Sequence, residues 1–248
     1  MSDVNFKVNT SRALPSPVAQ GLNAPTRATR YGELIAQPLD RHVLSDEGTY
    51  FVAHNATNDA ATTLAGHPAP VLADADATMT KPFLHLRHGG GSTSLVRVYL
   101  KLIEIEVVTA GANGTAANYA WQLDTGASRI SSGGTALTKV NPNMQSSAAS
   151  VLDILGGDPI SGVESANVRH GGHGVLRPTI EIAGDKKVFI FGERPTLGGD
   201  GAAAAKREQP VNMPPVILGP TDQFLLALYA PSQSVAGVYK VRIEWYER

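Results

Sequence analysis

The sequence predicts an all-β protein: an antiparallel β-sandwich, jelly-roll-like, with an extended irregular N-terminal arm. Short apolar segments separated by Gly, Pro and Asn recur from residue 48 onward, and helical periodicity is nearly absent. The first 45 residues differ, because small polar residues there are interrupted by prolines that favour extended backbone, namely Pro15, Pro17, Pro25 and Pro38. We therefore expect an arm over 1–45 and a sandwich domain over 46–248.

Composition narrows the classes of function. Of 248 residues, 42% are apolar, and 17% are charged, which is below the usual level of about a quarter. A net charge of −1 with no basic run argues against direct nucleic-acid binding. The absence of cysteine excludes disulfides, thiolate metal sites and cysteine nucleophiles. Neither a signal peptide nor an apolar run of the roughly 20 residues that span a bilayer is expected, so we predict cytosolic synthesis and no membrane partner.

The arm is a candidate binding element. Five basic residues against three acidic residues give residues 1–45 a net charge of +2. A proline-rich polar segment of this kind gains order when it lies on something, so we expect it to pack on a neighbouring subunit or to wrap its own domain. The candidate partner-binding residues are Arg12, Arg27, Arg30, Tyr31 and Arg41.

The strand signals begin with Thr49–Ala53 and Phe83–Leu86, and the glycine run at 89–91 ends the second of these. The longest strand is expected over Leu95–Val108. Its apolar residues first occupy even positions, from Val96 to Leu102, and then odd positions, from Ile103 to Val107. One extra residue produces such a slip, which predicts a β-bulge or a crossing between sheets near Leu102–Glu104.

The remaining strands are shorter. Val151–Leu155 fits a strand or a helical turn, and Val175–Ile182 with Lys187–Phe191 predicts a hairpin around Ala183–Asp185. The last strand alternates cleanly between apolar and charged residues. The other expected strands are Tyr119–Leu123, Val216–Leu218, Phe224–Tyr229 and Val238–Tyr246.

Two histidine pairs are candidate metal ligands: His85 with His88, and His170 with His173. Clustered histidines are typical of zinc and iron sites. However, residues three apart on a strand point to opposite faces, and no carboxylate stands at ligand spacing. We therefore predict loop histidines that make surface hydrogen bonds, and no metal, although the same residues at a subunit contact would confer pH sensitivity.

Other motifs are weaker. Asp74 and Asp76 supply too few spaced oxygens for a calcium loop, and no nucleophile elbow, phosphate loop or zinc-protease motif occurs. We therefore expect neither an enzyme nor a cofactor. Four aromatic residues fit either a sugar-binding platform or ordinary core packing, of which we favour packing; they are Tyr99, Trp121, Trp245 and Tyr246.

The second half of the chain resembles virion proteins of tailed bacteriophages. The resemblance covers roughly residues 125–248, and the segments that carry it are Ser131–Met144, Ser146–Ser150, Pro214–Pro220, Phe224–Gln233 and Arg242–Arg248. The resemblance implies a structural component of a viral particle, but it does not specify where in the particle the protein lies. The arm and residues 46–80 lie outside the resemblance.

Together these observations predict a capsid decoration or cement protein of a phage head, made in the host bacterial cytoplasm. Its expected partners are the major capsid protein and copies of itself, as a dimer or trimer, because closed symmetry is usual in homo-oligomers. One alternative is a receptor-binding or fibre-like virion protein that recognises host surface glycans. Others are a portal- or tail-proximal assembly protein and an enzyme of cupin or hydrolase type.

Overall fold

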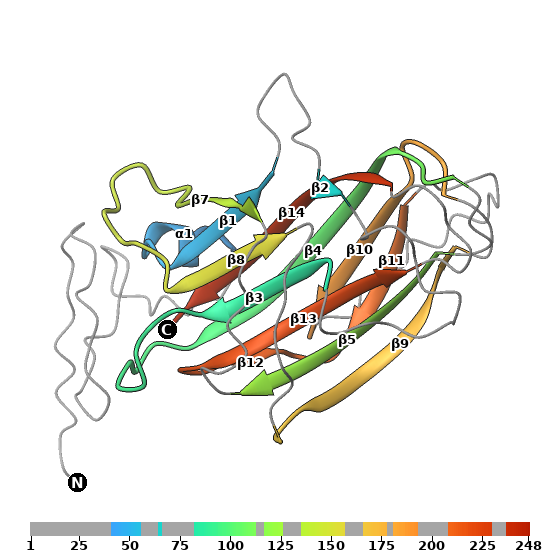
Figure 1. Ribbon diagram of the computed structural model, residues 1–248. Helices are drawn as coiled ribbons and strands as arrows, with labels where there is room; N and C mark the ends of the chain where they lie inside the picture. The colour runs from blue at the N-terminus through green and yellow to red at the C-terminus, as the bar shows by residue number, and fades with distance from the viewer. Residues whose placement is uncertain are drawn as a thin grey trace, which may run out of the picture. The chain divides into compact units, whose positions relative to one another are not determined.

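The computed structural model describes residues 41–55, 64–65, 82–112, 117–125, 135–156, 166–177, 181–192, 208–229 and 237–248. These residues fall into two compact units. One consists of residues 41–50 with Asn141–Ala148, and the other contains the remaining described residues, which form two β-sheets (Figure 1). The candidate partner-binding residues Arg12, Arg27, Arg30 and Tyr31 lie outside the described residues.

The larger sheet has eight strands. Its main path runs, in spatial order, through β11 (Glu208–Met213), β10 (Lys186–Phe191), β4 (Val98–Thr109), β14 (Val238–Glu247), β1 (Tyr50–His54) and β7 (Thr138–Val140). In addition, β12 (Ile217–Leu218) pairs with β4, and β2 (Leu64–Ala65) pairs with β14. Among the described pairings, β10 with β11 is parallel and the others are antiparallel.

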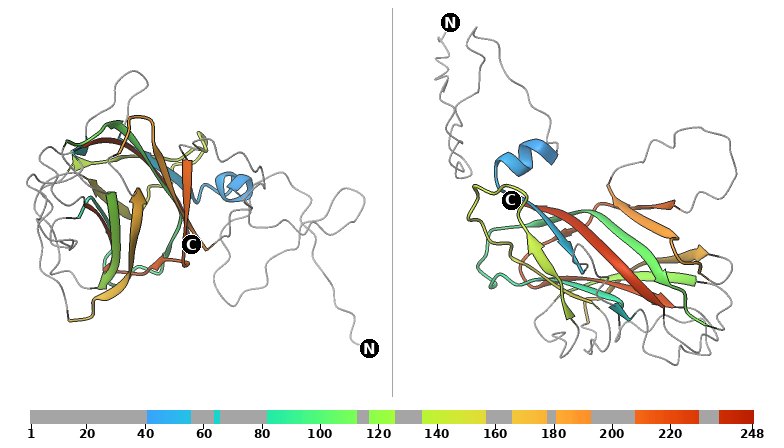
Figure 2. Two further views of the ribbon diagram at one scale, coloured as in Figure 1. Left: turned by 90° about the vertical axis from the view of Figure 1, so that its right-hand side faces the viewer. Right: turned by 90° about the horizontal axis from the view of Figure 1, so that it is seen from above.

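The smaller sheet has six strands. Their order is β6 (Thr135–Ala136), β8 (Leu152–Gly156), β3 (Leu84–His88), β13 (Asp222–Tyr229), β5 (Ala117–Thr125) and β9 (Arg169–Arg177). Its described pairings are all antiparallel. Figure 2 shows the two sheets as separate layers.

One apolar core lies between the two sheets. Alternate residues of β4 and β14 from one sheet, and of β3 and β13 from the other, bury their side chains in the same cluster. Aromatic rings join the layers edge to face: Tyr119 with Phe189 at 5.2 Å between centroids, and Phe191 with Phe224 at 5.6 Å. The predicted antiparallel β-sandwich is thereby confirmed, whereas the jelly-roll connectivity and the arm stay predictions.

The predicted phase slip in the long strand is a β-bulge. Trp245 of β14 pairs with Leu100, but its neighbour Glu244 pairs with Leu102, so Lys101 is the extra residue. Leu102 and Ile103 are consequently both buried, and the core-facing positions change from even to odd at this point. The bulge lies one residue before the predicted range, and β4 remains in one sheet along its whole length.

The predicted hairpin around Ala183–Asp185 is wrong. The strand before this turn is β9, which ends at Arg177 and pairs with β5 of the smaller sheet, whereas β10 after it pairs with β4 of the larger sheet. Gly184 does lie in a turn, with a φ of 84°. The chain therefore changes sheets here, a choice that depends on long-range packing that local turn chemistry does not encode.

Charged side chains link the two sheets. The Glu247 carboxylate of β14 accepts hydrogen bonds from Ser150 Oγ (2.5 Å) and Val151 N (3.1 Å), which precede β8, and from Trp245 Nε1 (3.0 Å). Lys187 of β10 donates to the carbonyl of Leu176 in β9. Glu247 pairs with Val98 and Lys187 with Ile105, so these two links lie at different positions along β4. A third link is formed by Lys139 of β7, which donates to the carbonyl of Leu152 in β8 at 2.8 Å.

A buried tyrosine adds a further polar contact. The Tyr239 hydroxyl of β14 donates to Glu181 Oε2 at 2.5 Å. Burial, followed by the charge of Glu181 and its hydrogen bond, raises the pKa of Tyr239 well above its ordinary value.

Glycines in β9 make room for aromatic rings of β5. A Cβ atom at Gly171 would lie 2.2 Å from the ring of Trp121, and one at Gly174 would lie 2.7 Å from the ring of Tyr119. Because both rings pack in or against the core, they have little room to move away. The Gly-rich sequence of this strand is therefore explained by packing.

We expect Gly171→Ala to destabilise the fold by about 1–3 kcal/mol, because the new methyl group overlaps the Trp121 ring. Urea denaturation followed by tryptophan fluorescence measures this change. Gly91→Ala is the matched control, since nothing lies within 4 Å of a Cβ atom at that position. Equal unfolding midpoints for the two variants would contradict the packing argument.

We expect Glu247→Gln to lower the free energy of unfolding by about 1–3 kcal/mol, because an amide group places a donor against donors that now meet a carboxylate. Glu106→Gln is the control, since Glu106 forms a partly exposed ion pair with Lys186 and such pairs contribute little. Thermal unfolding at neutral pH compares the two. A loss in the control as large as that in Glu247→Gln would refute a special role for this link.

Candidate functional site

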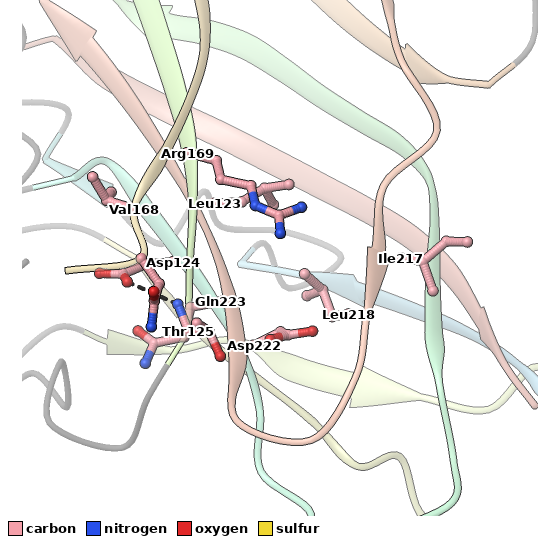
Figure 3. Close-up of a pocket in the computed structure, with 10 residues that line it drawn as sticks. Leu123, Asp124, Thr125, Val168, Arg169, Ile217, Leu218, Asp222 and Gln223 are labelled. Carbon is pink, nitrogen blue, oxygen red and sulfur yellow. Dashed lines mark hydrogen bonds between the residues drawn. The ribbon is translucent and has the colours of Figure 1, made fainter. Parts of the chain in front are cut away.

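A polar hollow of about 550 Å³ is the candidate ligand site. It lies where β5 ends, β9 begins and β12 leads into β13. Figure 3 shows Asp124, Arg169 and Asp222 approaching it from three different strands, with Leu123 and Leu218 forming apolar parts of the wall. Carboxylate, guanidinium and apolar groups within one hollow suit a small polar ligand.

Both carboxylates of the hollow are held by backbone amides. Asp222 Oδ2 accepts from Gly219 N at 2.8 Å, which closes the tight turn before β13, where Thr221 has a φ of 68°. Asp124, which is buried, accepts from Thr125 N at 2.7 Å through Oδ1. These bonds fix the orientation of both side chains, so the hollow presents a preformed set of acceptors beside the Arg169 guanidinium.

Sequence reasoning did not find this hollow. Its walls come from segments around residues 124, 168 and 220, and only the antiparallel pairing of β5 with both β13 and β9 brings them together. The one local signal was the turn Gly219–Asp222. Turn chemistry alone does not indicate a binding site.

The first histidine pair is buried within the smaller sheet. His85 Nε2 lies 2.7 Å from Gln223 Oε1 on the neighbouring strand β13. His88 Nε2 lies 2.9 Å from the carbonyl of Val96, while Gly90 N donates to His88 Nδ1 at 3.2 Å. An amide can only donate and a carbonyl can only accept, so His88 carries its proton on Nε2. Both side chains are buried in β3 and serve as structural hydrogen-bonding groups, so the expectation of loop histidines with surface hydrogen bonds is wrong for this pair.

The two histidines point to opposite faces, as the spacing predicted. Leu84 and Leu86 of β3 lie in the core, which places His88 on the core side and His85 on the outer side of the sheet. Within the part of the chain that the structure describes, no group of three or more His, Asp or Glu side chains could hold a metal ion.

The second histidine pair lies on the exposed strand β9. His170 and His173 are exposed, and β9 is the terminal strand of the smaller sheet. These residues pair through their backbones with Gln122 and Ala120 of β5. The sequence analysis expected loop histidines, so their place on an edge strand is a correction; the glycines around them had suggested a loop.

The four candidate aromatic residues divide into two pairs. Trp121 and Trp245 belong to the core, where they stack on Phe224 and Phe51 respectively. Tyr99 and Tyr246 are half-buried and stack on each other, with ring centroids 4.6 Å apart. The ammonium group of Lys101 lies 6.0 Å from the Tyr246 ring. A four-residue sugar platform is therefore excluded by the burial of both tryptophans.

Charged residues form a network across β10, β4 and β14. Glu104 contacts Lys186 at 3.4 Å and Arg242 at 3.1 Å, and Lys186 also lies 3.4 Å from Glu106. Desolvation opposes the charge on Lys186, but the two glutamates outweigh it and raise the pKa of Lys186. Since these side chains are partly exposed, the network organises the sheet surface more than it stabilises the fold.

The smaller unit is organised by asparagines. Asn141 Nδ2 donates to the carbonyl of Gly48 at 2.9 Å, and Asn143 Nδ2 donates to that of Asp46 at 3.2 Å. These bonds join the segment 141–148 to the end of α1 (Arg41–Asp46), a helix that the sequence analysis did not predict. Arg41, the arm candidate within the described residues, is exposed at the first position of α1.

Comparisons with protein-family models, curated proteins and solved structures find no match to this chain. Among the described residues, no helix has both the length and the hydropathy needed to cross a membrane.

We expect the purified protein to carry no stoichiometric metal, and added Zn²⁺ to leave its unfolding midpoint unchanged. The reason is geometric: His85 and His88 lie on opposite faces, and both ring nitrogens of His88 are hydrogen-bonded. Elemental analysis after dialysis is the measurement, with His170→Ala as the exposed control. Metal retained by the wild type and lost in His88→Ala would overturn this assignment.

Proposed function

We propose that this protein is a non-enzymatic structural component of a tailed-phage particle, a capsid decoration or cement protein. It would bind the major capsid lattice and neighbouring copies of itself. The resemblance of residues 125–248 to virion proteins supports this proposal, as does the β-sandwich fold. Fold alone does not determine function, so the argument depends on how the polar side chains are used.

The observation that carries the proposal is that the residues best suited to chemistry serve as structural links. His85 joins β3 to β13, His88 fastens the loop after β3, and Glu247 links the two sheets. These side chains are also buried, so a substrate cannot come within hydrogen-bond reach of them without opening the fold. Polar side chains committed to internal hydrogen bonds fit a structural protein that binds its partners through its surface better than they fit an enzyme.

The mechanism would be binding at many weak contacts. Each subunit would bridge neighbouring shell proteins and add buried area that resists internal DNA pressure. The arm, with Arg12, Arg27, Arg30, Tyr31 and Arg41, would supply the attachment. A tethered arm holds its contacts at high effective concentration, so modest individual affinities add up to stable attachment.

A second candidate function is recognition of host surface glycans by a receptor-binding virion protein. The polar hollow favours it, because Arg169 and Asp222 place a donor group and an acceptor group beside apolar wall residues. Binding on a glycan array that Arg169→Ala abolishes would support this alternative. A further alternative is a portal- or tail-proximal assembly protein, which counting the copies per particle would distinguish from a head decoration protein.

We expect deletion of residues 1–40 to leave a folded domain but to reduce occupancy on particles at least tenfold. The deletion retains α1 and the asparagine contacts at its end, and it removes four of the five candidate arm residues. Tenfold corresponds to the loss of about 1.4 kcal/mol of binding free energy. Particles that lack the protein are incubated with each variant, and bound copies are counted by quantitative gel analysis.

The control separates binding from folding. Circular dichroism and thermal unfolding establish that the shortened chain is folded, and the triple variant Arg12→Ser, Arg27→Ser, Arg30→Ser tests the basic residues without shortening the arm. If the shortened chain binds particles in the same copy number as the wild type, the arm is not the anchor.

A further inference from the structure

Strand β9 is the most accessible sheet edge among the described residues. It is terminal in the six-stranded sheet, and its residues from Arg169 to His173 are exposed. In an antiparallel ladder, alternate residues of a terminal strand direct their N–H and C=O groups away from the sheet. Such a row of groups is a template for another strand.

The other described edges are protected. The β11 edge contains Pro210, which lacks an N–H donor, and β7 and β6 have only three and two residues. β9 has nine residues with neither proline nor lysine. Two register shifts relative to β5 leave a regular ladder from Gly172 to Val175. This stretch is where a further strand has the best geometry.

We propose that β9 pairs antiparallel with β9 of a second copy across a two-fold axis, joining two six-stranded sheets into one. The inference deepens the proposed function, because association between copies is part of it. Val175 is 61% exposed on this strand, and pairing with a second copy would cover part of its apolar side chain.

The occupant is a second copy because the strand is complementary to itself. With neutral histidines, residues 170–176 carry no formal charge, and arginines occur only at the two ends of β9. Antiparallel pairing therefore places an uncharged stretch on an identical one. A two-fold axis at His173 places this residue opposite its own copy, Gly174 opposite Gly172 and Val175 opposite Gly171, and the like charges of Arg169 and Arg177 meet only at the two ends of the ladder. Closed two-fold dimers are also the commonest homo-oligomers.

Glycines reduce the side-chain crowding on the two faces of the joined sheet. Gly171, Gly172 and Gly174 carry no side chains, so nothing at these positions meets the side chains of a second copy. The rings of Trp121 and Tyr119 lie against Gly171 and Gly174 and support the strand from the core side. The edge is thereby held in place by its own domain before a second copy arrives.

A charge-exchange experiment on the full chain tests the proposal. We expect the wild type to form dimers in sedimentation equilibrium, and His173→Glu and His173→Lys each to raise the dimer Kd about five- to tenfold, because the two substituted residues face each other across the axis. An equimolar mixture of the two variants should recover wild-type affinity as a heterodimer. Recovery in the mixture distinguishes a contact between copies from a structural role within one copy.

The matched control is Ile182→Glu, which places the same charge at an apolar residue that is 51% exposed and lies outside β9. It should dimerise like the wild type. A monomeric wild type, no recovery in the mixture, or an equal loss in the control would each overturn the proposal. Dimerisation in solution and occupancy on particles are separate measurements, so this inference and the proposed function can fail independently.

Discussion

The packing of two sheets on one apolar interior is the constraint on which the structure depends. Each sheet has an apolar inner face, and neither buries that face without the other. Aromatic rings of the two sheets meet across the interface at Phe189 and Phe224. Polar links between the sheets include Lys187 with the carbonyl of Leu176, and Glu247 with the start of β8.

This constraint also explains the polar residues inside and around the smaller sheet. A buried donor or acceptor without a partner costs more than an ordinary hydrogen bond contributes. His85 and Gln223 satisfy each other on adjacent strands, and His88 has an acceptor and a donor on its two nitrogens. The histidines that looked like candidate metal ligands in the sequence therefore hold neighbouring segments together through hydrogen bonds.

The sequence predicted the class of fold because strand alternation is a local property. The slip in β4 was readable from the switch between Leu102 and Ile103, and the last strand from its strict alternation. The sequence did not predict which sheet each strand joins. The turn at Gly184 connects strands of different sheets, and no residue near it distinguishes this connection from a hairpin. The sequence did not predict the hollow at Asp124 for the same reason, because its walls come together only through pairing between distant segments.

The position of β14 has a consequence for the order in which the protein folds. This strand, Val238–Glu247, lies between β4 and β1 in the sheet order, and its Trp245 is completely buried. During synthesis the ribosome releases residues 51–229 first. At that stage β4 lacks its neighbour β14, and the interior lacks the side chain of Trp245. The larger sheet is therefore completed only after β14 has been synthesised. A nascent chain paused before residue 238 is therefore the species most in need of a chaperone.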